Sequence, residues 1–300
     1  MTVSVVIPTL NGGERFKQLL SALKRQKTVH DMELIVIDSD STDGTVEAAR
    51  DAGAKLIQID GAEFNHGRTR NKAIAQSSGE YILLLTQDAV PVGASFIETL
   101  ADCLDNDALL AGATARQIPV EGQRVFTKMK HSRKETAGET ALTFDRQTKG
   151  FPLFDSVAAM ARAAVLKYIP LPELDFAEDR AWAKEAVGAG LRLRYEPQAV
   201  VEHSHDRSLF YSYARGYVEG RFWQSQGESR YEEETSKSLV RAGVQSAYDL
   251  VALLENTPDL KSGFMEAAFA AAHNVAEQLG GQLGQAEEKA SRPNRFKGKV

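Results

Sequence analysis

The stretch YILLLTQDAVP, residues 81–91, contains the feature that decides the fold. Four consecutive apolar residues, Ile82 to Leu85, predict a strand that is buried on both faces. The strand ends in Thr-Gln-Asp, which puts one carboxylate, Asp88, at its C-terminal tip. A carboxylate in that position predicts either a ligand for a hard cation or a turn residue ahead of Pro91.

Strand and helix patterns alternate through the first half of the chain. Strand-like runs occur at 3–7, 33–37, 55–59 and 80–85, and helical patterns such as that of 16–23 lie between them. Continuous apolar strands separated by helices predict an α/β fold, with a mostly parallel sheet covered by helices on both faces. In such sheets, ligands bind beyond the carboxyl ends of the strands, so the residues at those ends are the first candidates for function.

Composition limits the class of protein. The chain has 300 residues, of which 43% are apolar, which is enough for one large domain or two smaller ones. A net charge of -5 argues against a nucleic-acid partner, and a single cysteine, Cys103, excludes an internal disulfide framework. The first residues, MTVSVVIPTLNGG, lack the basic region of a signal peptide, and no apolar run is long enough to span a bilayer. We therefore expect a soluble, cytoplasmic protein.

The second half divides into regions of different character. Residues 116–150 contain eight Lys or Arg against four Asp or Glu and few periodic apolar positions, which indicates a functional lid or a disordered, solvated loop. Strand and helix patterns return from 151. We expect a catalytic domain at 1–206, a helical extension at 207–283 and a basic, disordered tail at 284–300.

Acidic and histidine residues at the ends of elements are the candidates for chemistry, because no G-x-G-x-x-G, P-loop or H-E-x-x-H motif is present. Asp38 closes the second strand and could bind a nucleobase or ribose, or cap the next helix. Glu178 and Asp179 open a helix, where an acid either complements the helix dipole or acts as a general base. His203 and His205 lie two residues apart and form a candidate pair of metal ligands.

Six short blocks follow one another in a characteristic order. They are Phe-Asn-His-Gly (64–67), Thr-Arg-Asn (69–71), Leu-Thr-Gln-Asp-Ala (85–89), Arg-Gln-x-Pro (116–119), Glu-Asp (178–179) and His-Ser-His (203–205). With VSVVIPTLNGG and IVIDSDSTDGT, they resemble a family 2 glycosyltransferase of the GT-A fold, and more closely its bacterial rhamnosyltransferase-like branch. The resemblance covers about residues 1–225, and the helical remainder is much less diagnostic.

The resemblance implies a role for each candidate. Asp179 would be the general base that takes the proton of an acceptor hydroxyl, with inversion at the anomeric carbon. Asp88 would hold Mg²⁺ or Mn²⁺, with His203 as a second ligand of the metal or the diphosphate. The resemblance also implies an acceptor-side loop or lid at 116–150. The residues implied on the nucleotide and donor side are Pro8, Thr9, Asp38, Arg70, Asn71, Gln87 and Glu178.

Two positions depart from the family pattern. Thr86 replaces the first acid of the Asp-x-Asp signature, so the affinity for metal without nucleotide should be low. Asp40 stands where the family has Gly, and it either accepts a turn with positive φ or alters the choice of donor. The resemblance implies a dTDP-sugar donor, with rhamnose as the leading sugar and UDP-hexoses close behind.

The expected function is surface polysaccharide synthesis with a glycan or lipid-linked acceptor. The aromatic stretch 207–226 would pack as a helix on the catalytic domain or lie on a membrane surface, giving at most peripheral membrane contact. The C-terminal helices could pair two chains in a homodimer. Two alternatives are a nucleotidyltransferase, which would want a Lys before Lys17 in the first strand–helix loop, and a non-catalytic sugar-nucleotide-binding protein.

Overall fold

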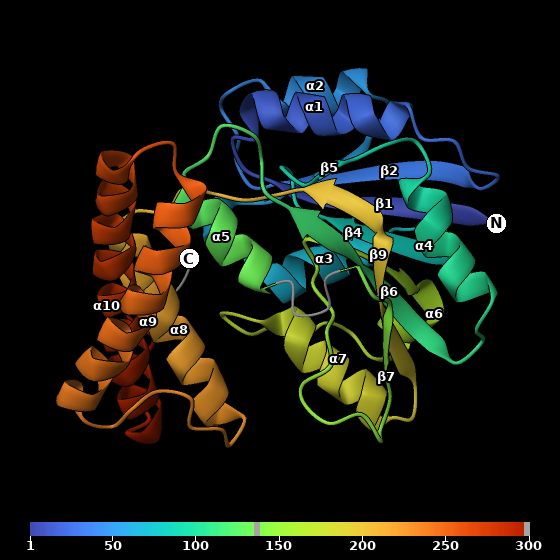
Figure 1. The fold of residues 1–300 in the computed structure, drawn as a ribbon. Coiled ribbons are helices and arrows are strands. Elements are labelled where there is room, and N and C mark those ends of the chain that lie inside the picture. Colours follow the sequence, from blue (N-terminus) through green and yellow to red (C-terminus); the bar gives the residue numbers. More distant parts are fainter. Residues whose placement is uncertain (135–138, 297–300) are drawn as a thin grey trace. The chain divides into compact units, whose positions relative to one another are not determined.

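The computed structural model describes residues 1–134 and 139–296 and divides into two compact units (Figure 1). The first unit comprises Met1–Ile118 and Glu135–His203, and the second comprises Pro119–Lys134 and Ser204–Val300. None of the described helices is both long and apolar enough to cross a membrane.

One mixed sheet forms the centre of the first unit. Its strands are β1 (Thr2–Thr9), β2 (Asp31–Asp38), β3 (Lys55–Gln58), β4 (Tyr81–Leu85), β5 (Val90–Pro91), β6 (Leu110–Ile118), β7 (Leu142–Phe144), β8 (Ala158–Arg162) and β9 (Arg192–Glu202). Their order is β3-β2-β1-β4-β8-β6-β9-β5, and β7 pairs with β9. Strands β1 to β4 are parallel, whereas β8 runs antiparallel between β4 and β6. The predicted α/β sheet is therefore confirmed, with antiparallel strands in its second half.

Helices cover both faces of this sheet (Figure 1). One face packs on α1 (Gly13–Lys24), α2 (Thr45–Asp51) and α4 (Phe96–Asp105), and the other on α3 (His66–Ile74), α6 (Ala163–Tyr168) and α7 (Glu178–Gly188). Because successive side chains of a strand point to opposite faces, Val5 belongs to the first core and Val6 to the second. This two-sided burial explains the continuous apolar run in β4.

The parallel strands bring three loops to one edge of the sheet. Thr9 at the end of β1 is in register with Asp38 at the end of β2, and Val6 is in register with Leu84 of β4. The segments after Thr9, Asp38 and Leu85 therefore leave the sheet side by side, which is where the sequence predicted the site.

The second unit is helical. It contains α5 (Val125–Lys134), α8 (Leu209–Ser225), α9 (Thr235–Asn256) and α10 (Leu260–Lys289). Helices α8 and α10 approach closely, because Gly216 and Gly220 of α8 and Gly280 and Gly284 of α10 leave room for each other's backbone. Three of the aromatic residues of α8, Tyr217, Phe222 and Trp223, are buried.

The division of the chain differs from the expected one. Residues 116–150 are not an irregular loop throughout, because they contain α5 and β7, and 119–134 belong to the helical unit. The backbone N–H of Val120 donates to Ser204 Oγ (2.8 Å) and Thr127 Oγ1 donates to Asp206 Oδ1 (2.6 Å), and these bonds hold the segment there.

The expected disordered tail also differs from the structure. Residues 284–289 complete α10, because Gly284 packs on α8 and Glu287 is buried. Tyr217 Oη donates to Glu287, and Arg295 forms an ion pair with the same carboxylate. The end of the predicted tail, 297–300, lies outside the described residues.

Candidate active site

The ends of β1 and β2 are joined through Asp38. Its carboxylate is fully buried and accepts hydrogen bonds from Thr9 Oγ1 (2.7 Å), from the backbone N–H of Ser41 (2.9 Å) and from Ser41 Oγ (2.5 Å). Pro8, just before Thr9, is half-buried. Three of the acceptor positions of Asp38 are thus used by the protein, and the residue fixes the shape of the loop after β2.

The β1–α1 loop is held by Gln87. Its side-chain amide donates to the carbonyl of Leu10 (3.0 Å) and accepts from the backbone N–H of Leu10 (2.9 Å). In the loop after β2, Asp40 has a φ of 67° and its Oδ2 accepts from the backbone N–H of Gly61 (2.7 Å). The departure at position 40 is therefore accommodated by a left-handed turn, which Asp tolerates better than most residues.

Asp88 and His203 lie together, as expected for two ligands of one cation. Asp88 Oδ1 is 3.7 Å from His203 Nε2, and both side chains are largely buried. Ligand atoms about 2.1 Å from one ion lie about 3 Å apart at right angles and about 4 Å apart on opposite sides. The observed separation falls between these limits, and a carboxylate and an imidazole are both ligand types for divalent cations. His205 belongs to the second unit.

Two further side chains brace this pair. Arg15 Nε donates to the carbonyl of Asp88 (3.1 Å), and its Nη2 donates to the carbonyl of Glu202 (2.8 Å), the residue before His203. Gln117, at the end of β6, lies 3.0 Å from His203 Nδ1 through its Oε1, and its Nε2 donates to Asp155 Oδ2 (3.0 Å). The imidazole is therefore held from the side opposite Asp88.

Asp179 begins α7 in surroundings that favour the protonated acid. Its Oδ2 accepts from the backbone N–H of Ser156 (3.0 Å), and its Oδ1 from the backbone N–H of Arg180 (2.7 Å). Desolvation, followed by the charges of Glu178 and Asp155, raises the pKa of Asp179 to about 7. A carboxylate with this pKa is matched to proton transfer near neutral pH.

Glu178, the neighbour of Asp179, forms a buried ion pair with Arg70. The distance from Arg70 Nη1 to Glu178 Oε1 is 2.9 Å, and each side chain is less than 10% exposed. Ser156 Oγ also donates to Glu178 Oε1 (3.2 Å). Arg70 Nε is buried and finds no hydrogen-bond partner among the described residues, which leaves one donor for a ligand.

Asn71 occupies a different environment from the one expected. Its Nδ2 donates to the carbonyl of Leu171 (2.7 Å) and its Oδ1 accepts from the backbone N–H of Leu171 (3.1 Å). Because each end of the amide bonds to this backbone, Asn71 holds α3 against the segment before α7.

The sequence reasoning did not single out Gln117, Asp155 or Ser156. Gln117 lies within the Arg-Gln-x-Pro block, and Asp155 and Ser156 lie in the strand-like run FPLFDSVAAM (151–160). All three link the candidate metal pair to the candidate base. A polar pair inside an otherwise apolar strand pattern is the one signal in the sequence that could have revealed Asp155 and Ser156.

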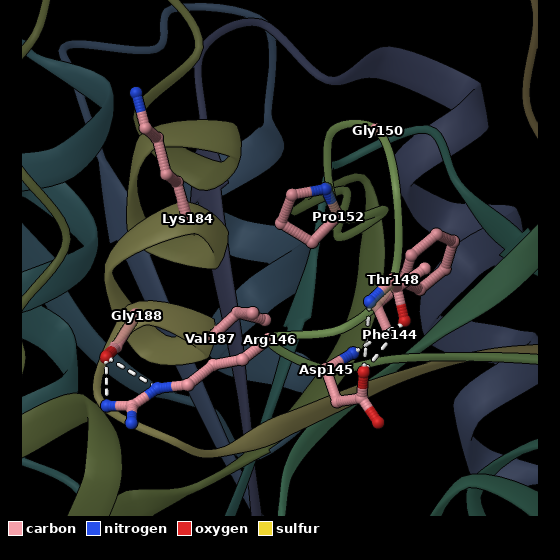
Figure 2. Close-up of a pocket in the computed structure, with 9 residues that line it drawn as sticks. All are labelled: Phe144, Asp145, Arg146, Thr148, Gly150, Pro152, Lys184, Val187 and Gly188. Atoms are coloured by element: carbon pink, nitrogen blue, oxygen red, sulfur yellow. Dashed lines mark hydrogen bonds between the residues drawn. The ribbon is translucent and has the colours of Figure 1, made fainter.

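A cavity of about 250 Å³ adjoins the last turns of α7. Figure 2 shows α7 on one side of it and the segment 144–152 on the other, with Arg146 bonded to the carbonyl of Gly188. The cavity is lined by Phe144, Asp145, Arg146, Thr148, Gly150, Pro152, Lys184, Val187 and Gly188. It is thus formed in part by the segment expected to face the acceptor.

The class of protein follows from comparison with known proteins. Residues 4–169 match the model of glycosyl transferase family 2. The O-antigen chain rhamnosyltransferase RfbN of Salmonella typhimurium is 32% identical over 229 residues, which cover 74% of this chain and 72% of that protein. The chain therefore belongs to glycosyl transferase family 2 and is a glycosyltransferase.

Solved structures agree on the fold. The mannosyltransferase PcManGT of Pyrobaculum calidifontis, in complex with GDP-Man and Mn²⁺, has a TM-score of 0.61 at 17% identity, covering 97% of this chain and 88% of that chain. The TarS fragment 1–349 of Staphylococcus aureus, in complex with UDP-GlcNAc, has a TM-score of 0.57 at 19% identity, covering 98% of this chain and 93% of that one. The predicted GT-A fold with a C-terminal helical region is confirmed.

Proposed function

We propose that this enzyme is an inverting, metal-dependent glycosyltransferase of bacterial surface polysaccharide synthesis. It would move a sugar from a nucleotide donor to a hydroxyl of a glycan or lipid-linked acceptor. The observation that carries the proposal is the Asp88–His203 pair, which lies in the same unit as Asp179. The similarity to the rhamnosyltransferase RfbN supports rhamnose as the leading sugar. The proposed donor is dTDP-rhamnose, with UDP-hexoses next.

Asp179 would act as the general base. Its carboxylate takes the proton of the acceptor hydroxyl, the hydroxyl oxygen forms a bond to the anomeric carbon, and the bond from that carbon to the diphosphate oxygen breaks on the opposite face. The configuration is inverted because attack and departure occur on opposite faces. The backbone N–H groups of Ser156 and Arg180 fix the orientation of the carboxylate before the acceptor arrives.

Asp88 and His203 would hold Mg²⁺ or Mn²⁺ against the donor diphosphate. The bound cation would supply charge neutralisation for the departing nucleoside diphosphate. Arg15 fixes the backbone on both sides of this pair, so the two ligand atoms are held in place before the donor binds.

The remaining donor-side residues would fall into two groups, one near the nucleobase and one near the diphosphate and sugar. Pro8, Thr9 and Asp38 would shape the pocket for the nucleobase, and Gln87 would hold the β1–α1 loop beside it. Arg70, which has a buried Nε–H to spare, would meet the diphosphate or the sugar, with Glu178 fixing its position. Residues 139–150 and the cavity beside α7 would contact the acceptor.

The proposed reaction places the enzyme in the cytoplasm, at the inner face of the membrane when the acceptor is lipid-linked. Leu209 and Phe210, which are exposed at the start of α8, are the apolar groups available in that helix for peripheral contact. Co-sedimentation with anionic vesicles tests this contact, and light scattering tests the pairing of two chains.

Asp179→Asn separates an enzyme from a binding protein. Loss of the base should lower turnover by about 10²–10⁴-fold, measured as release of nucleoside diphosphate in the presence of acceptor, while nucleotide binding is retained. Asp51→Asn, an exposed change in α2, serves as the control. Turnover unchanged by Asp179→Asn would exclude Asp179 as the base. A nucleotidyltransferase would instead release pyrophosphate from a nucleoside triphosphate.

A further inference from the structure

A chain of hydrogen bonds leaves the back of the candidate metal site. His203 follows β9, and its Nδ1 lies 3.0 Å from Oε1 of Gln117, near the end of the neighbouring strand β6. Nε2 of Gln117 lies 3.0 Å from Oδ2 of Asp155, a half-buried residue whose Oδ1 accepts from the backbone N–H of Val157 (3.0 Å). All four residues belong to the first unit.

The chemistry of these groups allows one orientation of the bonds. An ionised carboxylate only accepts hydrogen bonds, so Asp155 requires the NH₂ end of the Gln117 amide. The oxygen end of the same amide must then face His203, and an oxygen only accepts. Nδ1 of His203 must therefore carry a proton, and in the neutral ring this leaves the lone pair of Nε2 on the side of Asp88.

We propose that Gln117 and Asp155 are positioning residues that hold His203 in the Nδ1–H tautomer, so that its Nε2 is ready to bind the divalent cation. The inference rests on the proposed function, because it assumes that a cation binds between Asp88 and His203. Second partners of this kind fix both the tautomer and the ring orientation of a metal-ligating histidine.

The same turn connects the cation site to the base. Ser156, next to Asp155 in the chain, donates its backbone N–H to Asp179 Oδ2 (3.0 Å). Asp155 thus acts on His203 through Gln117 and lies beside the residue that orients Asp179. Variants of Gln117 leave Asp155, Ser156 and the bond from Ser156 to Asp179 in the chain, so they test the effect on His203 separately.

Nitrogen-15 NMR of the histidine-labelled protein, without added metal and at pH 8, reads the tautomer directly, with His203→Gln providing the assignment. We expect the Nδ1–H pattern for His203 in the wild-type protein. Asp155→Asn lets the Gln117 amide turn over, and Gln117→Met removes it, so both variants should lose the single-tautomer pattern. Gln198→Met, an exposed change in β9, should leave the pattern unchanged.

Mn²⁺ titration in the presence of dTDP or UDP gives the second readout. Gln117→Met and Asp155→Asn should weaken Mn²⁺ binding by about 10-fold or more, and circular dichroism of each variant verifies folding. An Nε2–H tautomer in the wild-type protein would overturn the proposal, as would Mn²⁺ binding that is lost in Asp88→Ala but unchanged in both variants. Mn²⁺ binding that is unchanged even in Asp88→Ala and His203→Gln would instead overturn the proposed cation site.

Discussion

At the scale of single residues, Asp179 is a carboxylic acid of the candidate site whose pKa is raised. Burial and the nearby charges of Glu178 and Asp155 oppose its ionisation. The base is active only when it is ionised, and its pKa is about 7. We therefore expect kcat/KM to rise with pH up to about 7 and then to level off, in a pH–rate profile taken with saturating cation.

Asp155→Asn should shift this pH profile. Removal of one negative charge near Asp179 lowers the cost of ionising it, so the rising limb should move to lower pH. Asp51→Asn should leave the limb where it is. A wild-type profile that stays flat down to pH 5 would contradict the assignment of Asp179 as the base.

The same pKa has a consequence for stability. In the unfolded chain Asp179 would titrate near 3.9, whereas in the folded chain its pKa is about 7. The folded state therefore binds the proton more tightly, and the contribution of Asp179 to stability falls as pH rises between these two values. The melting temperature of Asp179→Asn minus that of the wild-type protein should therefore be larger at pH 8 than at pH 5.5. Equal differences at both pH values would contradict the raised pKa.

At the scale of elements, the buried Arg70–Glu178 pair connects α3 to α7. Removing one partner leaves a buried charge uncompensated, so Arg70→Met should destabilise the protein by about 3–5 kcal/mol. The double change Arg70→Met and Glu178→Gln should recover much of that loss, measured as the free energy of unfolding in urea. A double variant no more stable than the single one would show that the cost is in packing and not in charge.

The contact between α8 and α10 depends on glycine. A Cβ on Gly284 would overlap the carbonyl oxygen of Tyr217, whereas a Cβ on Gly243 of α9 would meet nothing within 4 Å. Gly284→Ala should therefore cost about 3 kcal/mol or more, and Gly243→Ala should stabilise by about 0.5–1 kcal/mol. Thermal unfolding of the two variants checks this, and a Gly284→Ala protein as stable as wild type would contradict the close packing.

The sequence predicted those parts of the site and fold that local pattern determines. Apolar runs located β1 to β4, and the family blocks selected Asp88, Asp179 and His203 as candidates. The bonds from Gln117 to Asp155 and to His203 cross 38 and 86 residues, so no local spacing announces them. Asn71 was expected at the nucleotide, but its contacts with Leu171 depend on tertiary packing that the motif does not encode.

At the scale of the whole molecule, the chain builds two units from interleaved segments. Residues 119–134 belong to the second unit, together with helices α8, α9 and α10. Bonds such as that from Gln123 Nε2 to the carbonyl of Ser204 (2.6 Å) hold the segment in this unit. Composition alone suggested one basic loop at 116–150, because the partners of this segment lie about 80 residues further along the chain. The alternation of strands and helices was sufficient for the fold of the first unit only.

The central claim is that a divalent cation held by Asp88 and His203 binds the donor nucleotide. Calorimetric titration of the purified chain with dTDP, UDP and GDP, each with and without Mn²⁺ or Mg²⁺, tests it most directly. We predict that one nucleotide binds only when cation is present, and that this binding is lost in Asp88→Ala but kept in the exposed control Asp102→Ala. Failure of every nucleotide to bind with either cation, or binding that Asp88→Ala leaves unchanged, would contradict the account.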